Sequence, residues 1–230
     1  MRLYPLNPTS RLAINISSIS RRLGFRVLVS YLPGRDRGLR GLILVTDGTP
    51  DDYVVAILSH HLNGEEVFAI VKPEKPRFDA LSFISNYLSQ LRGLSKIAIF
   101  MDQERDTLEA IYKKMKGILR GCDGNLVRDR LCFYKCLHGG RKYEVVLIIN
   151  GLNEIGSGRH TIEDHLLQAA RRFLDVDISD VVDSKDFWWN RLRDMHDEVY
   201  NRLRTAGREE ISRIFPQQFE GLKLLKEEIT

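Results

Sequence analysis

Two short acidic segments carry the residue types best suited to chemistry in this sequence. Each segment directly follows an apolar run of four or five residues, Leu42–Val45 in the first case and Ile97–Met101 in the second. Carboxylates that converge repel one another unless protons or a cation neutralise them. Oxygen ligands without His or Cys beside them suit a hard cation such as Mg²⁺ or Mn²⁺. The sequence therefore predicts a cation site built from Asp47, Asp51, Asp102, Glu104 and Asp106.

The same acids have a plainer interpretation as helix-initiating residues. Asp47 and Asp51 precede or open one predicted helix, and Asp102 and Asp106 precede another. Acidic side chains at these positions cap the backbone N–H groups and interact well with the helix dipole. Capping explains each acid singly. A shared site explains better why both clusters follow strands, since ligands of open α/β sheets bind beyond the carboxyl ends of the strands.

Other polar residues are expected at the same edge of the sheet. Gly48 allows a sharp turn after Asp47, and Lys72, Lys75 and Arg77 follow the next apolar run. These basic side chains could bind phosphate, or the segment could be a solvated loop. Further along the chain, His160, Glu163 and Asp164 could add ligands, although Thr161 followed by Asp164 also fits a helix-capping pattern. The segment 151–159 is expected to form a loop over the site.

Strands and helices alternate through the middle of the chain, which predicts an α/β fold. Short apolar runs at 42–45, 67–71 and 97–101 are each followed by a helical pattern, at 50–62, 77–91 and 107–119. This order is typical of right-handed βαβ units in a mostly parallel sheet flanked by helices. Two more strands are predicted at 130–137 and 143–149, joined by a hairpin turn, and the chain from about residue 162 is predicted to be mostly helical. We expect three parts: a basic segment 1–40 with one strand at 25–31, an α/β domain 41–175, and a helical C-terminal appendage 176–230.

Composition bounds the class of protein. The chain has 230 residues, 43% of them hydrophobic and 29% charged, with a net charge of +4, so a folded protein compatible with a nucleic-acid partner is expected. The three cysteines are an odd number in a chain that begins without a signal peptide. We therefore expect no disulfide framework and a cytoplasmic location. No apolar run approaches the ~20 residues that span a bilayer, so a soluble protein without a membrane partner is expected.

Together the two acidic segments resemble the TOPRIM domain. The first segment is a strand followed by an acidic residue, Gly, two residues and Asp. The second, two βα units later, is a strand followed by Asp-x-acid-x-Asp. These segments are similar to the motifs shared by bacterial-type primases, topoisomerases, recombination-repair and overcoming-lysogenization-defect nucleases, and small ribosomal-RNA maturation nucleases. The resemblance covers about residues 41–119 and is strongest to short stand-alone TOPRIM-like proteins of archaea and bacteria. The family has Glu where this chain has Asp47, and Asp where it has Glu104.

The resemblance implies specific roles. Asp47 would be the catalytic acid/base, and Asp102 with Glu104 would bind Mg²⁺, with Asp106 and Asp51 in support. The implied function is Mg²⁺-dependent phosphoryl transfer on nucleic acid, most simply by a nuclease. The alternative is a TOPRIM-like module without catalysis that binds nucleic acid, or binds a protein partner through its C-terminal helices.

Overall fold

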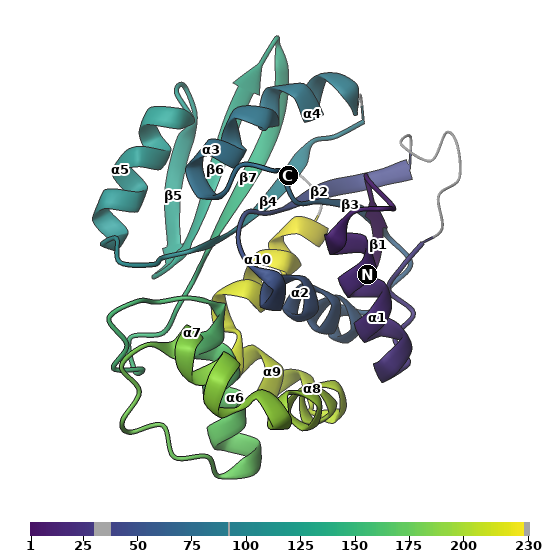
Figure 1. Ribbon diagram of the computed structural model, residues 1–230. Coiled ribbons are helices and arrows are strands. Elements are labelled where there is room, and N and C mark those ends of the chain that lie inside the picture. Colours follow the sequence, from purple (N-terminus) through teal and green to yellow (C-terminus); the bar gives the residue numbers. More distant parts are fainter. Residues whose placement is uncertain (30–37, 92, 228–230) are drawn as a thin grey trace.

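The sheet dominates the architecture of this protein. The computed structural model describes residues 1–29, 38–91 and 93–227. It contains a seven-stranded sheet in the order β1-β3-β2-β4-β7-β6-β5 (Figure 1). Among the strands that the structure describes, β6 pairs antiparallel with both β5 and β7, and all the other pairs are parallel. The strands are β1 (Arg2–Pro5), β2 (Leu39–Val45), β3 (Val67–Val71), β4 (Lys96–Asp102), β5 (Asp123–Arg128), β6 (Leu131–His138) and β7 (Arg141–Asn150).

Helices cover both faces of the sheet (Figure 1). One face carries α3 (Arg77–Ala80), α4 (Ile84–Gln90) and α5 (Leu108–Ile118), and the other carries α1 (Arg11–Leu23), α2 (Thr49–Leu62) and α10 (Pro216–Lys226). On the second side, α2 and α10 also contact the group α6 (Ile162–Leu174), α7 (Ser184–Asp186), α8 (His196–Thr205) and α9 (Arg208–Ile214). No helix in these described ranges is long and apolar enough to cross a bilayer.

The central strands are apolar on both faces because both faces are covered. In β2, Leu42 and Leu44 pack on one side of the sheet, while Ile43 and Val45 pack on the other. All four side chains are fully buried. Such continuous apolar runs are typical of strands in a parallel sheet between two helical layers.

The predicted α/β pattern is confirmed in its central part. The strands predicted at 42–45, 67–71 and 97–101 are β2, β3 and β4, and the hairpin strands are β6 and β7. The helices predicted at 50–62 and 107–119 are α2 and α5. The helix predicted at 77–91 is divided, because a 3₁₀ turn over Leu81–Phe83 separates α3 from α4. The prediction also missed β5.

The N-terminal region differs from the expectation. The strand predicted at 25–31 is wrong where the structure describes it, since only a single bridge joins Leu28 to Leu3; residues 30 and 31 lie outside the described residues. Instead β1 pairs with β3, and α1 packs against α2. Ser10 caps α1 by accepting a 3.2 Å hydrogen bond from the N–H of Ala13. The division of the chain into three parts stays a prediction, although residues of all three share one hydrophobic core.

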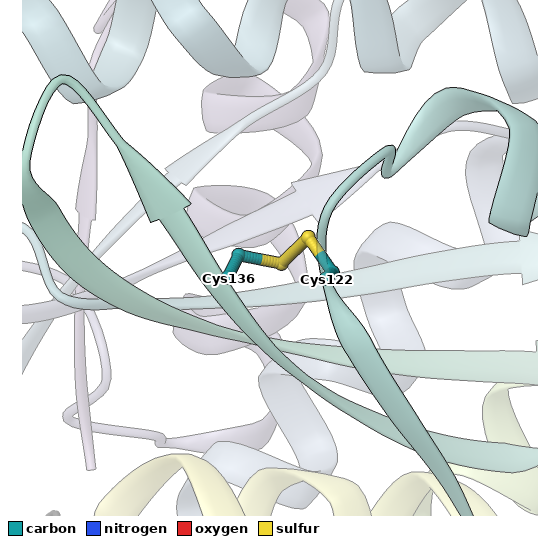
Figure 2. The surroundings of a disulfide bond; sticks show 2 residues. All are labelled: Cys122 and Cys136. Atoms are coloured by element: carbon teal, nitrogen blue, oxygen red, sulfur yellow. A yellow bond between two sulfur atoms is a disulfide. The ribbon is translucent and has the colours of Figure 1, made fainter.

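A disulfide joins Cys122 to Cys136, so the expectation that the cysteines form no disulfide is wrong for this pair (Figure 2). Cys132 is free and buried. Cys122 immediately precedes β5, the exposed strand at the edge of the sheet, and Cys136 lies in β6. The bond therefore ties the start of the edge strand to its neighbour. A spacing of 14 residues within an odd set of cysteines gave no sign of this pairing.

Candidate metal centre

The predicted site lies at the carboxyl ends of three adjacent strands. β4 pairs with β2 on one side and with β7 on the other, and Asp102 stands opposite Asn150 in the register. Asp47 follows β2 by two residues. The ends of the first and third predicted strands therefore meet, as expected from the sequence.

Three carboxylates converge at this edge. Asp47, Asp102 and Glu104 each offer one oxygen, and these oxygens all lie within 4.8 Å of one another. Oxygen ligands of a single Mg²⁺ ion lie at most about 4.2 Å apart, because each bond is 2.0–2.1 Å long. Among three oxygens on one octahedral cation only one pair can be this far apart, and the other pairs are about 3 Å apart, so the three side chains would have to move closer together around a bound ion.

The hydrogen bonds of Asp47 and Asp102 leave one oxygen of each available. Asp47 Oδ2 accepts from the N–H of Asp102 at 2.9 Å and lies 2.7 Å from the Thr46 hydroxyl. Asp102 Oδ1 accepts from Asn150 Nδ2 at 2.9 Å and from the N–H of Ile162 at 3.1 Å. In the described ranges no hydrogen bond ends on Asp47 Oδ1 or Asp102 Oδ2, so these oxygens can take a cation or a proton.

The capping interpretation does not hold for Asp47 or Asp102. The residue that caps α2 is Gly48, and α5 is capped by Thr107, whose hydroxyl accepts from the N–H of Ala110 at 3.2 Å. Asp102 instead accepts from Ile162, the first residue of α6, a helix 60 positions away. The positive end of the α6 dipole thus faces a carboxylate of the cluster.

Burial makes ionisation of the carboxyl groups in the cluster unfavourable. Asp51 and Asp102 are each 1% exposed. Burial, and next the charges of neighbouring carboxylates, raise the pKa of both groups well above the ordinary value of 3.8. Burial also raises the pKa of Asp47, although hydrogen bonds from Asp102 and Thr46 oppose the shift. Without a cation, these groups therefore favour the protonated form.

Two buried carboxylate oxygens near the cluster lack any hydrogen-bond partner in the described part of the chain. They are Asp51 Oδ2 and Glu163 Oε2. The other oxygen of each group is engaged: Asp51 Oδ1 accepts from Asn150 Nδ2 at 2.7 Å, and Glu163 Oε1 accepts from Trp189 Nε1 at 3.1 Å. An unsatisfied buried carboxylate oxygen is costly unless a proton or cation compensates it. The donor set therefore fits a hard divalent cation.

Basic side chains lie beside the acids. Arg159 binds both carboxylate oxygens of Glu104, with Nη2 2.8 Å from Oε1. This contact raises the pKa of Arg159, and the residue stays charged. Arg77 Nη2 donates to Asp106 Oδ2 at 2.8 Å and to the carbonyl oxygen of Asp102 at 3.3 Å. Guanidinium groups at the rim of a carboxylate cluster are suited to phosphate oxygens.

Several other predicted residues lie outside the group formed by Asp47, Asp102 and Glu104. Asp106 is paired with Arg77 and, like Asp51, is outside the group of three converging acids. Lys72 donates to the carbonyl oxygen of Gly48 at 2.7 Å and lies 3.5 Å from Asp52. Lys75 is exposed.

The His160 and Asp164 side chains pair with each other at the start of α6. Buried Asp164 Oδ2 lies 2.9 Å from His160 Nδ1 and accepts from the N–H of Leu152 at 2.9 Å. Thr161 is the N-cap residue of α6, as the sequence pattern predicts, but its side chain makes no capping hydrogen bond. Backbone hydrogen bonds between His160 and Glu104 instead hold the start of α6 against the second acidic segment.

Sequence reasoning missed Asn150 and Arg159 as site residues. Asn150 directly follows a strand predicted at 143–149, so the rule that located Asp47 and Asp102 would also have found it. Arg159 lies in an irregular loop, where no periodicity signals that its side chain turns toward Glu104.

Comparisons with known proteins add no relative. A scan against protein-family models found no match, and searches of curated proteins and of solved structures found none either. The resemblance to the TOPRIM domain therefore stays a prediction from the residues quoted above.

Proposed function

We propose that this protein binds one divalent cation, Mg²⁺ or Mn²⁺, through Asp47, Asp102 and Glu104 and performs phosphoryl transfer on nucleic acid as a TOPRIM-type nuclease. The observation that carries the proposal is the convergence of these three carboxylates within 4.8 Å at the carboxyl edge of the sheet. The adjacent arginines support a phosphate substrate, and the net charge of +4 is compatible with a polyanion.

Each side chain has a distinct task in this proposal. A bound divalent cation would polarise a phosphoryl oxygen and stabilise the charge that develops there. Asp102 and Glu104 would hold it. Asp47, with Oδ1 available and a raised pKa, is suited to complete the ligand set or to accept a proton from attacking water, because a base works best with a pKa near the working pH.

The arginines would recognise the phosphodiester. Arg159 is bidentate to Glu104, and a phosphate group can accept the same pair of hydrogen bonds. Transfer of Arg159 to the phosphate would release Glu104 to the cation. Arg77, held between the Asp106 carboxylate and two backbone carbonyls, would add positive charge at the same edge.

One observation favours the alternative of a binding module without catalysis. The pairing of Arg159 with Glu104 neutralises one acid of the cluster by a protein group alone. In a module of this kind the arginine and the acid would stay paired, and nucleic acid would bind without being cleaved.

Cleavage assays with purified protein separate the two functions. Single- and double-stranded DNA and RNA would be incubated with Mg²⁺, with Mn²⁺ and with EDTA, using wild type and Asp102→Asn. Asp197→Asn is the matched control, because it removes an exposed acid of α8 that pairs with Arg22. We expect cation-dependent cleavage by wild type and the control, and a loss on the order of 100-fold or more in Asp102→Asn. Binding without cleavage by wild type would support the module, and equal cleavage by Asp102→Asn would overturn the proposed site.

A further inference from the structure

We infer that Gln218, in the C-terminal helix α10, is a positioning residue of the metal centre that acts through Asn150. The expected effect of Gln218 on cation binding rests on the proposed function, whereas its effect on the orientation of the Asn150 amide does not. It makes α10 a component of the site rather than an appendage to the domain.

A chain of side-chain hydrogen bonds links α10 to the acids. Gln218 Nε2 donates to Asn150 Oδ1 at 3.0 Å. Asn150 Nδ2 in turn donates to Asp51 Oδ1 at 2.7 Å and to Asp102 Oδ1 at 2.9 Å. An amide nitrogen has two hydrogens to give and its oxygen has none. By occupying the oxygen, Gln218 therefore fixes the orientation in which both N–H groups of Asn150 point at carboxylates.

The opposite orientation of Asn150 would be harmful to the site. When Asp51 and Asp102 are ionised, as they would be around a bound cation, a reversed amide would direct its carbonyl oxygen at groups that can only accept hydrogen bonds. It would also place the amide nitrogen against Gln218 Nε2, another donor. Gln218 thus selects one of two amide orientations that have nearly the same shape.

His165 holds Gln218 in turn. Its Nδ1 lies 2.7 Å from the carbonyl oxygen of Ile214, which can only accept, so Nδ1 carries the proton and Nε2 is an acceptor. Burial lowers the pKa of His165 to about 3, so the ring is neutral. Gln218 Nε2 donates to His165 Nε2 at 2.9 Å. Both hydrogens of the Gln218 amide are therefore committed, one to His165 and one to Asn150.

Stability alone does not explain a glutamine at this position. Gln218, Asn150 and His165 are all fully buried. Gln218 Oε1 has no hydrogen-bond partner in the described part of the chain, and a buried unsatisfied acceptor costs about 1–3 kcal/mol. An apolar side chain would avoid that cost. Residues that break a local rule in this way are expected at functional sites.

The neighbouring residue Gln217 offers a matched control. Gln217 is also buried, and its Nε2 donates to the carbonyl oxygens of Ile149 at 3.2 Å and Gly151 at 3.1 Å and lies 3.1 Å from His165 Nε2. It makes no hydrogen bond with Asn150. Gln218→Met and Gln217→Met therefore remove the same chemical group from adjacent buried positions, and only Gln218→Met removes a direct hydrogen bond to Asn150.

Two measurements test the inference. The first is hydrogen exchange of the Asn150 side-chain amide by ¹H–¹⁵N NMR without added cation, assigned with Asn150→Asp. The second is Mn²⁺ affinity by calorimetry. In Gln218→Met we expect protection of the Asn150 amide to fall at least about tenfold and Mn²⁺ affinity to fall about 10–100-fold, the range typical of residues that orient metal ligands. In Gln217→Met both should stay within about twofold of wild type even if the protein unfolds at a lower temperature.

The outcomes separate the inference from the proposed function. Retained protection in Gln218→Met, or equal losses in both variants, would overturn the positioning role. If wild type binds no Mn²⁺, the proposed function fails, while the exchange measurement still decides whether Gln218 orients Asn150. Should Gln218→Met not fold, Gln218→Asn keeps the amide but is one methylene shorter. It should show the same loss of protection.

Discussion

The N–H of Asp102 donates a 2.9 Å hydrogen bond to the Asp47 carboxylate, although 55 positions separate the two residues. The last residue of β4 thereby fixes the position of the acid that follows β2 through a hydrogen bond within the protein. Preorganisation of this kind is what a metal or catalytic site requires of its supporting residues. The same arrangement also brings carboxylates together in a buried place, where negative charge destabilises the folded protein.

Asp51→Asn should stabilise the protein in the absence of cations. The buried Asp51 carboxyl is destabilised by burial and by its acidic neighbours, whereas an asparagine oxygen can still accept from Asn150. We expect the free energy of unfolding at pH 8 in EDTA to rise by about 0.5–2 kcal/mol, as replacement of strained functional groups commonly does. Urea denaturation measures the change, with Asp197→Asn as the surface control. A loss of stability in Asp51→Asn would contradict the electrostatic account.

The stabilising effect of removing the buried acids should grow with pH. The pKa values of Asp51 and Asp102 are raised on folding, so their contribution to stability is fully present below the ordinary pKa of 3.8 and is lost as pH rises through the raised values. The difference in unfolding free energy between the double variant Asp51→Asn/Asp102→Asn and wild type should therefore increase from pH 5 to pH 8, by about 1.4 kcal/mol per pH unit for each carboxyl that stays protonated in the folded protein. Urea denaturation in EDTA across this range tests the slope. A difference independent of pH would show that the two carboxyls have ordinary pKa values.

Arg159→Gln should bind Mn²⁺ more tightly than wild type but cleave more slowly. Loss of the guanidinium frees Glu104 from its ion pair, so we expect affinity to rise by about tenfold, equivalent to about 1.4 kcal/mol. Loss of a phosphate-binding group should reduce the cleavage rate by about 100-fold. Calorimetry and single-turnover cleavage report the two effects separately. Arg172→Gln, which breaks the partly exposed ion pair with Glu210, is the control. Weaker Mn²⁺ binding in Arg159→Gln would refute competition for Glu104.

Reduction of the Cys122–Cys136 disulfide should destabilise the protein. The bond closes a loop of about 15 residues, for which chain entropy predicts a loss of about 3 kcal/mol on reduction. Urea denaturation with and without a phosphine reductant measures this loss, and the double variant Cys122→Ser/Cys136→Ser should match the reduced protein. Equal stability with and without reductant would indicate that the two cysteines are not joined in the purified protein.

The sequence was informative where periodicity and strand position carry the signal. β2, β3 and β4 are continuous apolar runs, and the rule that ligands bind beyond strand ends predicts that Asp47 and Asp102 lie together, as their hydrogen bond confirms. The first strand and helix were missed. β1 has only four residues and ends in proline, and α1 mixes serines with its apolar positions, although Leu12, Ile16, Ile19 and Leu23 follow a helical spacing.

The supporting residues of the site lay beyond sequence reasoning for a different reason. Gln218 reaches Asn150 across 68 positions, and Arg159 reaches Glu104 across 55. Such contacts depend on how α10 and the loop before α6 pack on the sheet, which no local pattern specifies. The pairing of Cys122 with Cys136 likewise depends on the register of β5 against β6.

The most direct test of the metal centre is calorimetric titration of Mn²⁺ into wild type, Asp102→Asn and Glu104→Gln. The three carboxylates that converge within 4.8 Å should bind one Mn²⁺ per chain in wild type, with binding abolished in Asp102→Asn and weakened in Glu104→Gln. Binding to Asp102→Asn with wild-type affinity and stoichiometry would contradict a cation site at this edge of the sheet.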